Sequence, residues 1–414
     1  MMDILVYADW IGLNGPKKMG TLNVTHTKGH EVFSFAYDRE WLEKGLAQEL
    51  DPDLQFYSGN QYLSAGKKNF GAFLDSSPDR WGRVLMVRRE AIQARMDKRK
   101  PKPLFEEDYL LGVFDEHRMG ALRFKLEPDA PFLNDNSSLA TPPWTSIRDL
   151  EFASLQLEKD TLSDEDAIKW ISMLIAPGAS LGGARPKASV IDPEGNLWIA
   201  KFPSLGDSVD IGGWEMVVNT LAKNAGLNIA GGAIRRFNSK YHCFLSKRFD
   251  RTRDGKRLHF ASAMTLLGRS DGESGASYLD LAGFLIRHGS NVEKDLEELW
   301  RRIVFNIAVK NTDDHLRNHG FILEQTGWAL SPAFDINPNP YGHTLTLNIS
   351  ETDNSLDFDL ARSVGKYFRI DQKKMEVILG QIKAATEKWL QLAKQLRLPV
   401  SDQDIMTQAF EGNL

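Results

Sequence analysis

The stretch NTDDHLRNHGF, residues 311–321, together with SPAFDINP, residues 331–338, decides how the whole chain is interpreted. The first stretch gathers acidic, amide and imidazole side chains directly after an apolar helix predicted over residues 292–310. In the second stretch, Asp335 follows a predicted strand and a phenylalanine. Both stretches are therefore candidates for carrying chemistry.

Asp313 precedes Asn318 by five residues, which is the spacing of a protein-kinase catalytic loop. In that loop the aspartate receives the proton of the substrate hydroxyl, and the asparagine holds Mg²⁺. Asp335 lies 17 residues after Asn318, and its carboxylate could complete a magnesium site made of oxygen ligands. Taken alone, an Asp and an Asn at this spacing more often form an ordinary capped loop.

The upstream stretch GASLGGARPKA, residues 178–188, has the composition of a loop whose backbone amides cradle phosphate oxygens. Lys187 adds a positive charge as the chain enters a predicted strand. The stretch is not a P-loop, because Ala184 occupies the lysine position of that motif. It also spells GxSxG around Ser180, but the predicted helix before it and strand after it reverse the order that a hydrolase requires. A plain tight turn is the structural alternative.

Lys201 ends the apolar strand predicted in WIAKFP, where a lysine could pair with nucleotide phosphates. Glu215, 14 residues further on in a predicted helix, could orient it, and Asp210 is a competing partner. Lys201 could equally be a surface lysine on an edge strand. The order of the elements favours the kinase interpretation: glycine-rich loop, strand lysine, helix glutamate, Asp313 with Asn318, and then Phe-Asp.

Other kinds of site fit the sequence poorly. His315 and His319 are four residues apart, but no glutamate follows His315, so the pair is not the HExxH zinc motif. Cys243 is the only cysteine, which excludes an intrachain disulfide and cysteine-based zinc sites. No apolar run approaches the ~20 residues that span a bilayer, and the N-terminus lacks the features of a secretory signal. We therefore expect a cytoplasmic protein.

Composition indicates a folded, multidomain protein. The 414 residues carry 51 Lys+Arg and 56 Asp+Glu, a net charge of -5, and 42% of them are hydrophobic. Residues 80–102 are the exception, with nine basic and two acidic residues, or +7. Such a segment can meet phosphates, although a solvated helix face is the plainer interpretation.

The hydrophobic patterns predict a strand-rich first part and a helix-rich second part. The predicted strands cover 3–8, 21–25, 31–36, 121–126, a hairpin in 187–202, 232–237, 241–249, 320–324 and 328–331. The predicted helices cover 39–48, 80–97, 146–158, 164–175, 213–225, 292–310 and 370–396. We predict an N-terminal subdomain over 1–126, a linker over 127–145, a nucleotide-binding part over 146–255 and a helical catalytic lobe over 256–414.

At these motifs the sequence resembles the HipA family, the protein-kinase toxins of bacterial type II toxin–antitoxin systems. SLGGARPKA resembles the family's phosphorylatable glycine-rich loop, NTDDHLRNHGF its catalytic loop and AFDI its metal-binding segment. SKRFDR at 246–251 resembles the hinge strand, and FLDSSPDRWGRVLM at 73–86 resembles part of the N-terminal subdomain. The resemblance implies an α+β, two-lobed protein-kinase-like fold with a strand-rich N-terminal lobe and a mostly helical C-terminal lobe.

The resemblance also implies a role for each matching residue. Asp313 would be the catalytic base, Asn318 and Asp335 would bind Mg²⁺, and Ser180 would be the site of autophosphorylation that ejects the loop and inactivates the enzyme. The residues that would contact ATP are Gly182, Gly183, Ala184, Arg185, Pro186, Lys187, Lys201, Lys247, Arg248, Phe249, His315, Arg317, Asn318, Phe334 and Asp335. Asp314, at a position where the family commonly has a small residue, would strengthen the metal site or cap the loop.

The cofactors implied are ATP and Mg²⁺, and the activity implied is that of a serine/threonine protein kinase toxin. Its partners would be a helix-turn-helix antitoxin similar to HipB, a protein substrate such as an aminoacyl-tRNA synthetase, and operator DNA only through the antitoxin complex. Two other functions stay open. The chain could act mainly as a co-repressor clamped to a DNA-binding antitoxin, or it could be a small-molecule kinase.

Overall fold

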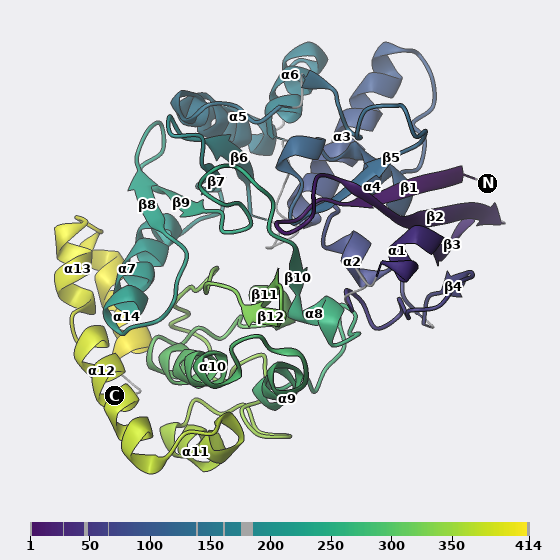
Figure 1. Ribbon diagram of the computed structural model, residues 1–414. Helices are drawn as coiled ribbons and strands as arrows, with labels where there is room; N and C mark the ends of the chain where they lie inside the picture. Colours follow the sequence, from purple (N-terminus) through teal and green to yellow (C-terminus); the bar gives the residue numbers. More distant parts are fainter. Residues whose placement is uncertain are drawn as a thin grey trace. The chain divides into compact units, whose positions relative to one another are not determined.

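The structure is a computed structural model that describes residues 2–27, 29–44, 49–64, 66–137, 140–159, 162–174 and 185–411. The chain folds into two compact units (Figure 1). The first unit comprises Met1–Ala200 and Asp250–Ser270, and the second comprises Lys201–Phe249 and Asp271–Leu414. The domain boundaries predicted at residues 126, 145 and 255 do not coincide with the boundaries of these two units. The domain division therefore stays a prediction. Among the described residues, no helix has the length and hydropathy needed to cross a membrane.

The first unit contains a five-stranded antiparallel sheet in the order β4-β3-β2-β1-β5. Its strands are β1 (Met2–Ala8), β2 (Lys17–Thr27), β3 (His30–Tyr37), β4 (Gln61–Tyr62) and β5 (Leu122–Lys125). Alternate residues of β1, namely Ile4, Val6 and Ala8, are fully buried, as expected for a strand with one face on the core. The strands predicted within 3–8, 21–25, 31–36 and 121–126 are confirmed.

Helices and a hairpin complete the first unit. The helices are α1 (Arg39–Glu43), α2 (Gly71–Leu74), α3 (Arg80–Met96), α4 (Glu106–Gly112), η1 (Asp115–His117), η3 (Trp144–Ser146), α5 (Ile147–Lys159), α6 (Asp164–Leu174) and α8 (Ala263–Leu266). The remaining strands are β6 (Lys187–Ile191), β7 (Leu197–Lys201) and β10 (Phe260–Ser262). Asp192 closes the turn of the predicted hairpin, since its side chain accepts hydrogen bonds from Asn196 N at 2.7 Å and Trp198 Nε1 at 2.8 Å.

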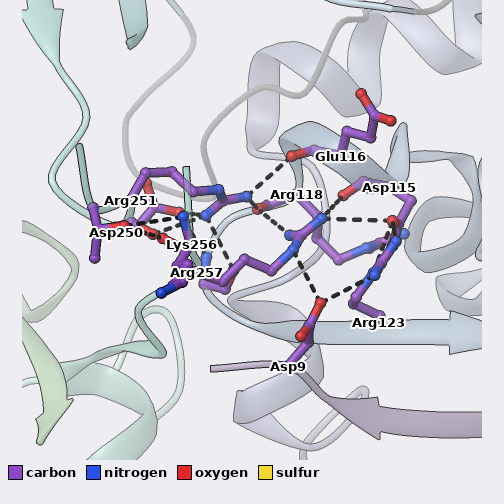
Figure 2. Close-up of polar contacts among 11 residues, drawn as sticks. Asp9, Asp115, Glu116, Arg118, Arg123, Asp250, Arg251, Lys256 and Arg257 are labelled. Carbon is purple, nitrogen blue, oxygen red and sulfur yellow. Dashed lines mark hydrogen bonds and ion pairs between the residues drawn. The ribbon is translucent and has the colours of Figure 1, made fainter. Parts of the chain in front are cut away.

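Segment 250–270 is part of the first unit, and its arginine side chains bond to earlier residues of that unit (Figure 2). Arg251 donates hydrogen bonds to the backbone carbonyls of Arg118 at 2.8 Å and Glu116 at 3.1 Å. Arg257 donates to the backbone carbonyl of Asp115, the first residue of η1, at 2.8 Å. Burial lowers the pKa of Arg118 and Arg257 to about 10, so both guanidinium groups stay charged at neutral pH. Buried charges need such hydrogen-bond partners, which explains the dense network.

The second unit is built around the buried helix α10. Its helices are α7 (Ile211–Asn224), α9 (Tyr278–His288), α10 (Val292–Ala308), η4 (Leu316–Asn318), α11 (Phe358–Val364), η5 (Gly365–Phe368), α12 (Gln372–Thr386), α13 (Trp389–Gln395) and α14 (Val400–Phe410). Its antiparallel strand pairs are β8 (Gly232–Arg235) with β9 (Cys243–Lys247), and β11 (Gly320–Glu324) with β12 (Gly327–Leu330). Helices α9, α11 and α12 contact α10, and Figure 1 shows them beside it.

The single helix predicted over 370–396 is wrong, because the chain forms two helices, α12 and α13, with a break at residues 387–388. Near the break the Thr386 hydroxyl donates to the Ile382 carbonyl at 2.9 Å, an interaction that bends helices. After the break, the Trp389 ring stacks on Phe410 with ring centroids 5.0 Å apart. Tertiary packing of this aromatic side chain therefore overrides the continuous apolar pattern.

Candidate active site

The predicted catalytic loop begins where α10 ends in the second unit. Lys310 has a left-handed φ of 50°, which turns the chain out of the helix. Asn311 then bonds back to the helix, because its N–H donates to the Asn306 carbonyl at 2.9 Å and its Nδ2 donates to Asn306 Oδ1 at 3.1 Å. The start of the loop is thus held by a buried pair of asparagines.

Asp313 carries the exposed carboxylate of this loop. The protein around it raises its pKa above the ordinary value, chiefly through partial desolvation. The charge on His315 opposes this rise, and the charges of Asp335 and Asp314 add to it. Within the described part of the chain, no side chain or backbone group forms a hydrogen bond with the Asp313 carboxylate. A carboxylate of raised pKa with unshared oxygens is suited to accept a proton.

Asn318 is buried beside Asp313, and its Nδ2 donates to the Asp313 backbone carbonyl at 2.9 Å. Its Oδ1 is buried and receives no hydrogen bond from any described residue. The same holds for Oδ1 of Asn337, whose Nδ2 donates to Asp335 at 3.1 Å. Buried oxygens without donors are rare because they lose their interaction with water. A bound cation can satisfy such an oxygen.

Asp335 also forms an ion pair with Lys201, whose side chain is 12% exposed. Lys201 Nζ lies 2.6 Å from Asp335 Oδ1 and 2.5 Å from Glu215 Oε1. Burial would lower the pKa of Lys201, but the charges of Asp335 and Glu215 outweigh burial and hold that pKa above its ordinary value. The lysine is therefore charged and fixed in place, and Glu215 is the partner of Lys201, as the sequence suggested. Asp210 instead caps α7, accepting from Gly213 N at 3.0 Å.

The backbone of Asp335 has a φ of 56°, in the left-handed region that non-glycine residues rarely adopt. Such a conformation costs about 1–3 kcal/mol and is concentrated at functional sites. It directs the Asp335 carboxylate to Lys201 and Asn337.

Oxygen donors of this kind fit a hard cation. Carboxylate and amide oxygens are the ligands that Mg²⁺ takes from proteins, together with water and phosphate oxygens. Asn318 and Asp335 are the predicted ligands, and the unsatisfied Oδ1 of Asn318 supports that expectation. Asn337 has a further amide oxygen that could bind a cation, and the sequence analysis did not identify it. Its position two residues after Asp335 was the only signal for it.

Asp314 holds the predicted catalytic loop in place through hydrogen bonds to buried side chains. Its Oδ2 accepts hydrogen bonds from the hydroxyl of Tyr278, from Asn306 Nδ2 at 2.9 Å and from His319 Nε2 at 2.8 Å. Burial would raise the pKa of Asp314, but His319 and the hydrogen bond from Tyr278 hold it below its ordinary value. With three donors on one oxygen, Asp314 orders the loop. Sequence reasoning missed Tyr278 and Asn306, because only the fold brings α9 and α10 to this carboxylate.

The other predicted residues of the second unit have contacts of their own. The Phe249 and Phe334 rings pack with centroids 5.5 Å apart, and Lys247 N donates to the Gly231 carbonyl at 2.7 Å. Arg317 forms a bidentate ion pair with Asp271 at 2.8 and 2.7 Å. Arg248 is buried, and His315 Nδ1 is buried with no hydrogen-bond partner among the residues described.

The glycine-rich loop is only partly described. Ser180, Gly182, Gly183 and Ala184 lie outside the described residues. Arg185, Pro186 and Lys187 belong to the first unit. Lys187 is 2% exposed, and its Nζ forms an ion pair with the buried carboxylate of Asp79 at 2.9 Å. The predicted contact of Lys187 with phosphates stays a prediction, and the ion pair gives this lysine a structural role as well.

The chain matches a solved structure of the Shewanella oneidensis toxin–antitoxin protein HipA, in a complex with HipB and operator DNA, with a TM-score of 0.66 and 16% identity. The match covers 99% of this chain and 96% of that one. At this identity the likeness shows the fold, which is the kinase-like α+β fold of HipA.

Residues 179–390 match the family model described as the HipA-like C-terminal domain. That match covers about half of the chain, and the protein belongs to the HipA-like family. A protein of Haemophilus influenzae described as a "putative kinase" is 28% identical over 191 residues, 40% of this chain and 54% of that protein. Another "putative kinase", from Sinorhizobium fredii, is 25% identical over 181 residues, 38% and 41% of the two chains. The chain spans about half the length of the curated relatives it matches.

Proposed function

We propose that this protein is an ATP- and Mg²⁺-dependent serine/threonine protein kinase that acts as the toxin of a type II toxin–antitoxin system. One observation carries the proposal. In the second unit a charged Lys201 pairs with the Asp335 carboxylate, whose charge acts on Asp313, and Asn318, with its unsatisfied Oδ1, bonds to the Asp313 backbone. Phosphoryl transfer needs such positioning and electrostatic groups and little else from a protein.

Each group then has a defined task. Lys201 holds nucleotide phosphates by charge, and Glu215 fixes the direction of its ammonium group. Asn318 and Asp335 would hold Mg²⁺, which would supply positive charge to offset the charge of the phosphates. Asp313 accepts the proton of the substrate hydroxyl as the bond from that oxygen to the γ-phosphorus of ATP forms and the bond from the γ-phosphorus to ADP breaks, which releases ADP. Asp314 keeps the loop that carries Asp313 in place.

We infer that the kinase inactivates itself by phosphorylating Ser180. A phosphoserine carries a charge of about -1.5 to -2 at neutral pH. Placed in a loop that cradles the phosphates of ATP, it would repel them. The resemblance of SLGGARPKA to the phosphorylatable loop of HipA kinases supports this inference.

The partners proposed follow from the family. The solved HipA relative is described in a complex with HipB and operator DNA, and we propose a similar helix-turn-helix antitoxin for this chain. A translation component such as an aminoacyl-tRNA synthetase is the proposed protein substrate, and growth arrest is the outcome expected of its phosphorylation.

The test is autophosphorylation. The purified protein is incubated with ATP and Mg²⁺, and Ser180 is followed by intact mass and peptide mapping. We expect one phosphate on Ser180 in the wild type and none in Asp313→Asn, which keeps the size of the side chain and removes its basicity. Circular dichroism should show that the variant is folded. Phosphorylation of Asp313→Asn at the wild-type rate would overturn the catalytic role of Asp313.

A co-repressor function is the second candidate, and the basic segment 80–102 is the observation that bears on it. Lys98 and Lys100 are exposed there, as phosphate binding requires. Much of the remaining charge is shared with acidic groups, as in the ion pairs Arg83–Glu106 and Arg95–Asp164. If the segment touches operator phosphates, neutralising Arg88 and Arg89 should reduce the salt dependence of operator binding by the antitoxin complex. A small-molecule kinase would show the same metal site and would be separated by substrate assays alone.

A further inference from the structure

A histidine and two glutamates meet in the first unit where the β2–β3 hairpin faces the start of α4. His26 and Glu31 are directly paired across the antiparallel strands, so their side chains lie on the same face of the sheet. The first turn of α4 brings Glu107 to them, and its Oε1 lies 2.7 Å from His26 Nε2. One ligand atom from each of the three residues lies within 4.8 Å of the other two.

Glu107 is buried without enough hydrogen-bond partners. It is 8% exposed, and its Oε2 receives no hydrogen bond from any residue that the structure describes. This oxygen belongs to the carboxylate whose other oxygen faces His26. A buried carboxylate oxygen without a hydrogen-bond donor raises the free energy of the folded state, because it loses its hydrogen bonds to water and forms none in the protein. The site therefore lacks a positive or hydrogen-bonding group at this oxygen.

Glu31 is held in position by the backbone. Its two carboxylate oxygens accept hydrogen bonds from Glu106 N at 2.8 Å and Glu107 N at 3.2 Å. The His26 ring packs edge-on against Phe105, with centroids 5.0 Å apart. Glu31 is thus oriented by backbone N–H groups of α4, and His26 by the Phe105 ring.

The local charge is negative and unbalanced. Arg83 pairs with Glu106, the residue before Glu107, through two hydrogen bonds of 2.8 and 2.7 Å. Among the described residues, no lysine or arginine forms an ion pair with Glu31 or Glu107. Two carboxylates that face each other without a cation repel unless a positive charge lies between them.

We propose that His26, Glu31 and Glu107 bind a divalent transition-metal ion, with Zn²⁺ as the best match. One imidazole nitrogen and two carboxylate oxygens are ligands that Zn²⁺ accepts, and water would fill a fourth, tetrahedral position. The imidazole disfavours Mg²⁺ and Ca²⁺, which prefer oxygen ligands alone. Ligand atoms ~2.1 Å from a tetrahedral ion lie about 3.4 Å from one another. The contact of 2.7 Å between His26 and Glu107 must therefore open by under 1 Å, which side-chain rotation allows.

The ion would connect the end of the β2–β3 hairpin to α4, two elements far apart in the sequence. Its effect would be on the stability of the first unit, since none of its ligands belongs to the candidate active site of the second unit. This inference is independent of the proposed kinase function.

The experiment uses the full-length protein, freed of metal with a chelator and kept in excess Mg²⁺ so that oxygen-only sites are filled. Zn²⁺ binding is measured by calorimetry, and Co²⁺ is added separately to read the visible absorption of a four-coordinate site. We expect one equivalent of Zn²⁺ to bind and to raise the melting temperature. In His26→Gln the affinity for this Zn²⁺ ion should fall at least about tenfold. Adding Zn²⁺ should then no longer raise the melting temperature.

His30→Gln is the matched control, because His30 is an exposed histidine of the same hairpin and does not belong to the cluster. It should bind Zn²⁺ as the wild type does. His26 is 42% exposed in its side chain, so His26→Gln should fold, and circular dichroism checks this. Glu107→Gln provides a second variant with the same expected loss. Equal Zn²⁺ affinity in wild type and His26→Gln, or no Zn²⁺ binding by the wild type, would overturn the proposal.

Discussion

At the scale of single residues, Lys201 is the group on which the proposed chemistry depends most. Its ammonium group is shared by two carboxylates, Glu215 at 2.5 Å and Asp335 at 2.6 Å. Two anions around one cation leave the site with a net negative charge, which is unfavourable for binding phosphates. This arrangement makes sense if Asp335 turns to a metal ion when nucleotide binds, leaving Lys201 oriented by Glu215.

We predict that Lys201→Met lowers the rate of autophosphorylation by roughly 100-fold or more, the usual cost of removing one preorganised charged or hydrogen-bonding group. Glu215→Gln should have a smaller effect, because the lysine keeps its charge and loses only part of its orientation. The rates are measured at saturating and at low ATP concentrations. Lys223→Met, which removes an exposed lysine of α7, is the control and should leave both rates unchanged. A Lys201→Met variant as active as this control would show that Lys201 is structural.

The residues of the candidate site divide into those that sequence could reveal and those that it could not. Asp313, Asn318, Asp335, Lys201 and Glu215 were predicted, because kinase chemistry fixes their types and their order along the chain. Tyr278 and Asn337 were missed. Tyr278 reaches Asp314 across 36 positions of sequence, and a hydroxyl at such a distance leaves no local pattern.

At the scale of secondary-structure elements, local patterns predicted most strands and helices, and tertiary packing decided the exceptions. The turn at Asp192 formed as its sequence indicated, because the side chain of an aspartate can bond the backbone of its own turn. The break between α12 and α13 did not follow from the apolar period, because it depends on the stacking of Trp389 against Phe410.

The buried ion pair between β6 and the N-terminus of α3 is another contact that local sequence does not show. Asp79 caps α3 through Gly82 N at 2.8 Å and also pairs with Lys187 at 2.9 Å. Removing one partner of a buried pair leaves an uncompensated charge and typically costs about 3–5 kcal/mol. We predict a loss of this size in the free energy of unfolding for Lys187→Met, measured by urea denaturation.

The double variant Asp79→Asn with Lys187→Met should lose less than the two single variants added together, because it leaves no lone charge and asparagine still caps the helix. Lys256→Met is the control. It breaks the exposed pair with Asp254 in the same unit and should cost under about 1 kcal/mol. Additive losses in the double variant would mean that the two side chains stabilise the unit independently.

At the scale of the whole molecule, the sequence indicated an α+β chain but not which segments share a unit. Segment 250–270 belongs to the first unit although it follows β9 of the second unit in the sequence. The cause is long-range, since Arg251 bonds to the carbonyls of Glu116 and Arg118, more than 130 positions earlier. Neither the spacing of the arginines nor the hydrophobic periodicity of the sequence predicts these long-range hydrogen bonds.

The same segment contains His259, which is 2% exposed and lies against the Trp10 ring, with centroids 5.2 Å apart. Burial lowers the pKa of His259 to about 3. In the unfolded chain a histidine has a pKa of about 6.5. Between these two values the unfolded state binds a proton that the folded state excludes. Above pH ~6.5 the imidazole is neutral in both states and does not affect stability. As pH falls from ~6.5 towards about 3, protonation of the unfolded state lowers the free energy of unfolding by about 1.4 kcal/mol per pH unit.

We therefore predict that the free energy of unfolding falls by about 2 kcal/mol more between pH 6.5 and pH 5 in the wild type than in His259→Phe, which keeps an aromatic ring and cannot titrate. Urea denaturation at the two pH values measures both slopes, and carboxylates that titrate in the same range cancel in the comparison. The variant His30→Gln, which replaces an exposed histidine, is the matched control. Equal slopes for the wild type and His259→Phe would mean that His259 takes up its proton in the folded protein. The buried segment would then have to open to water well above pH 5.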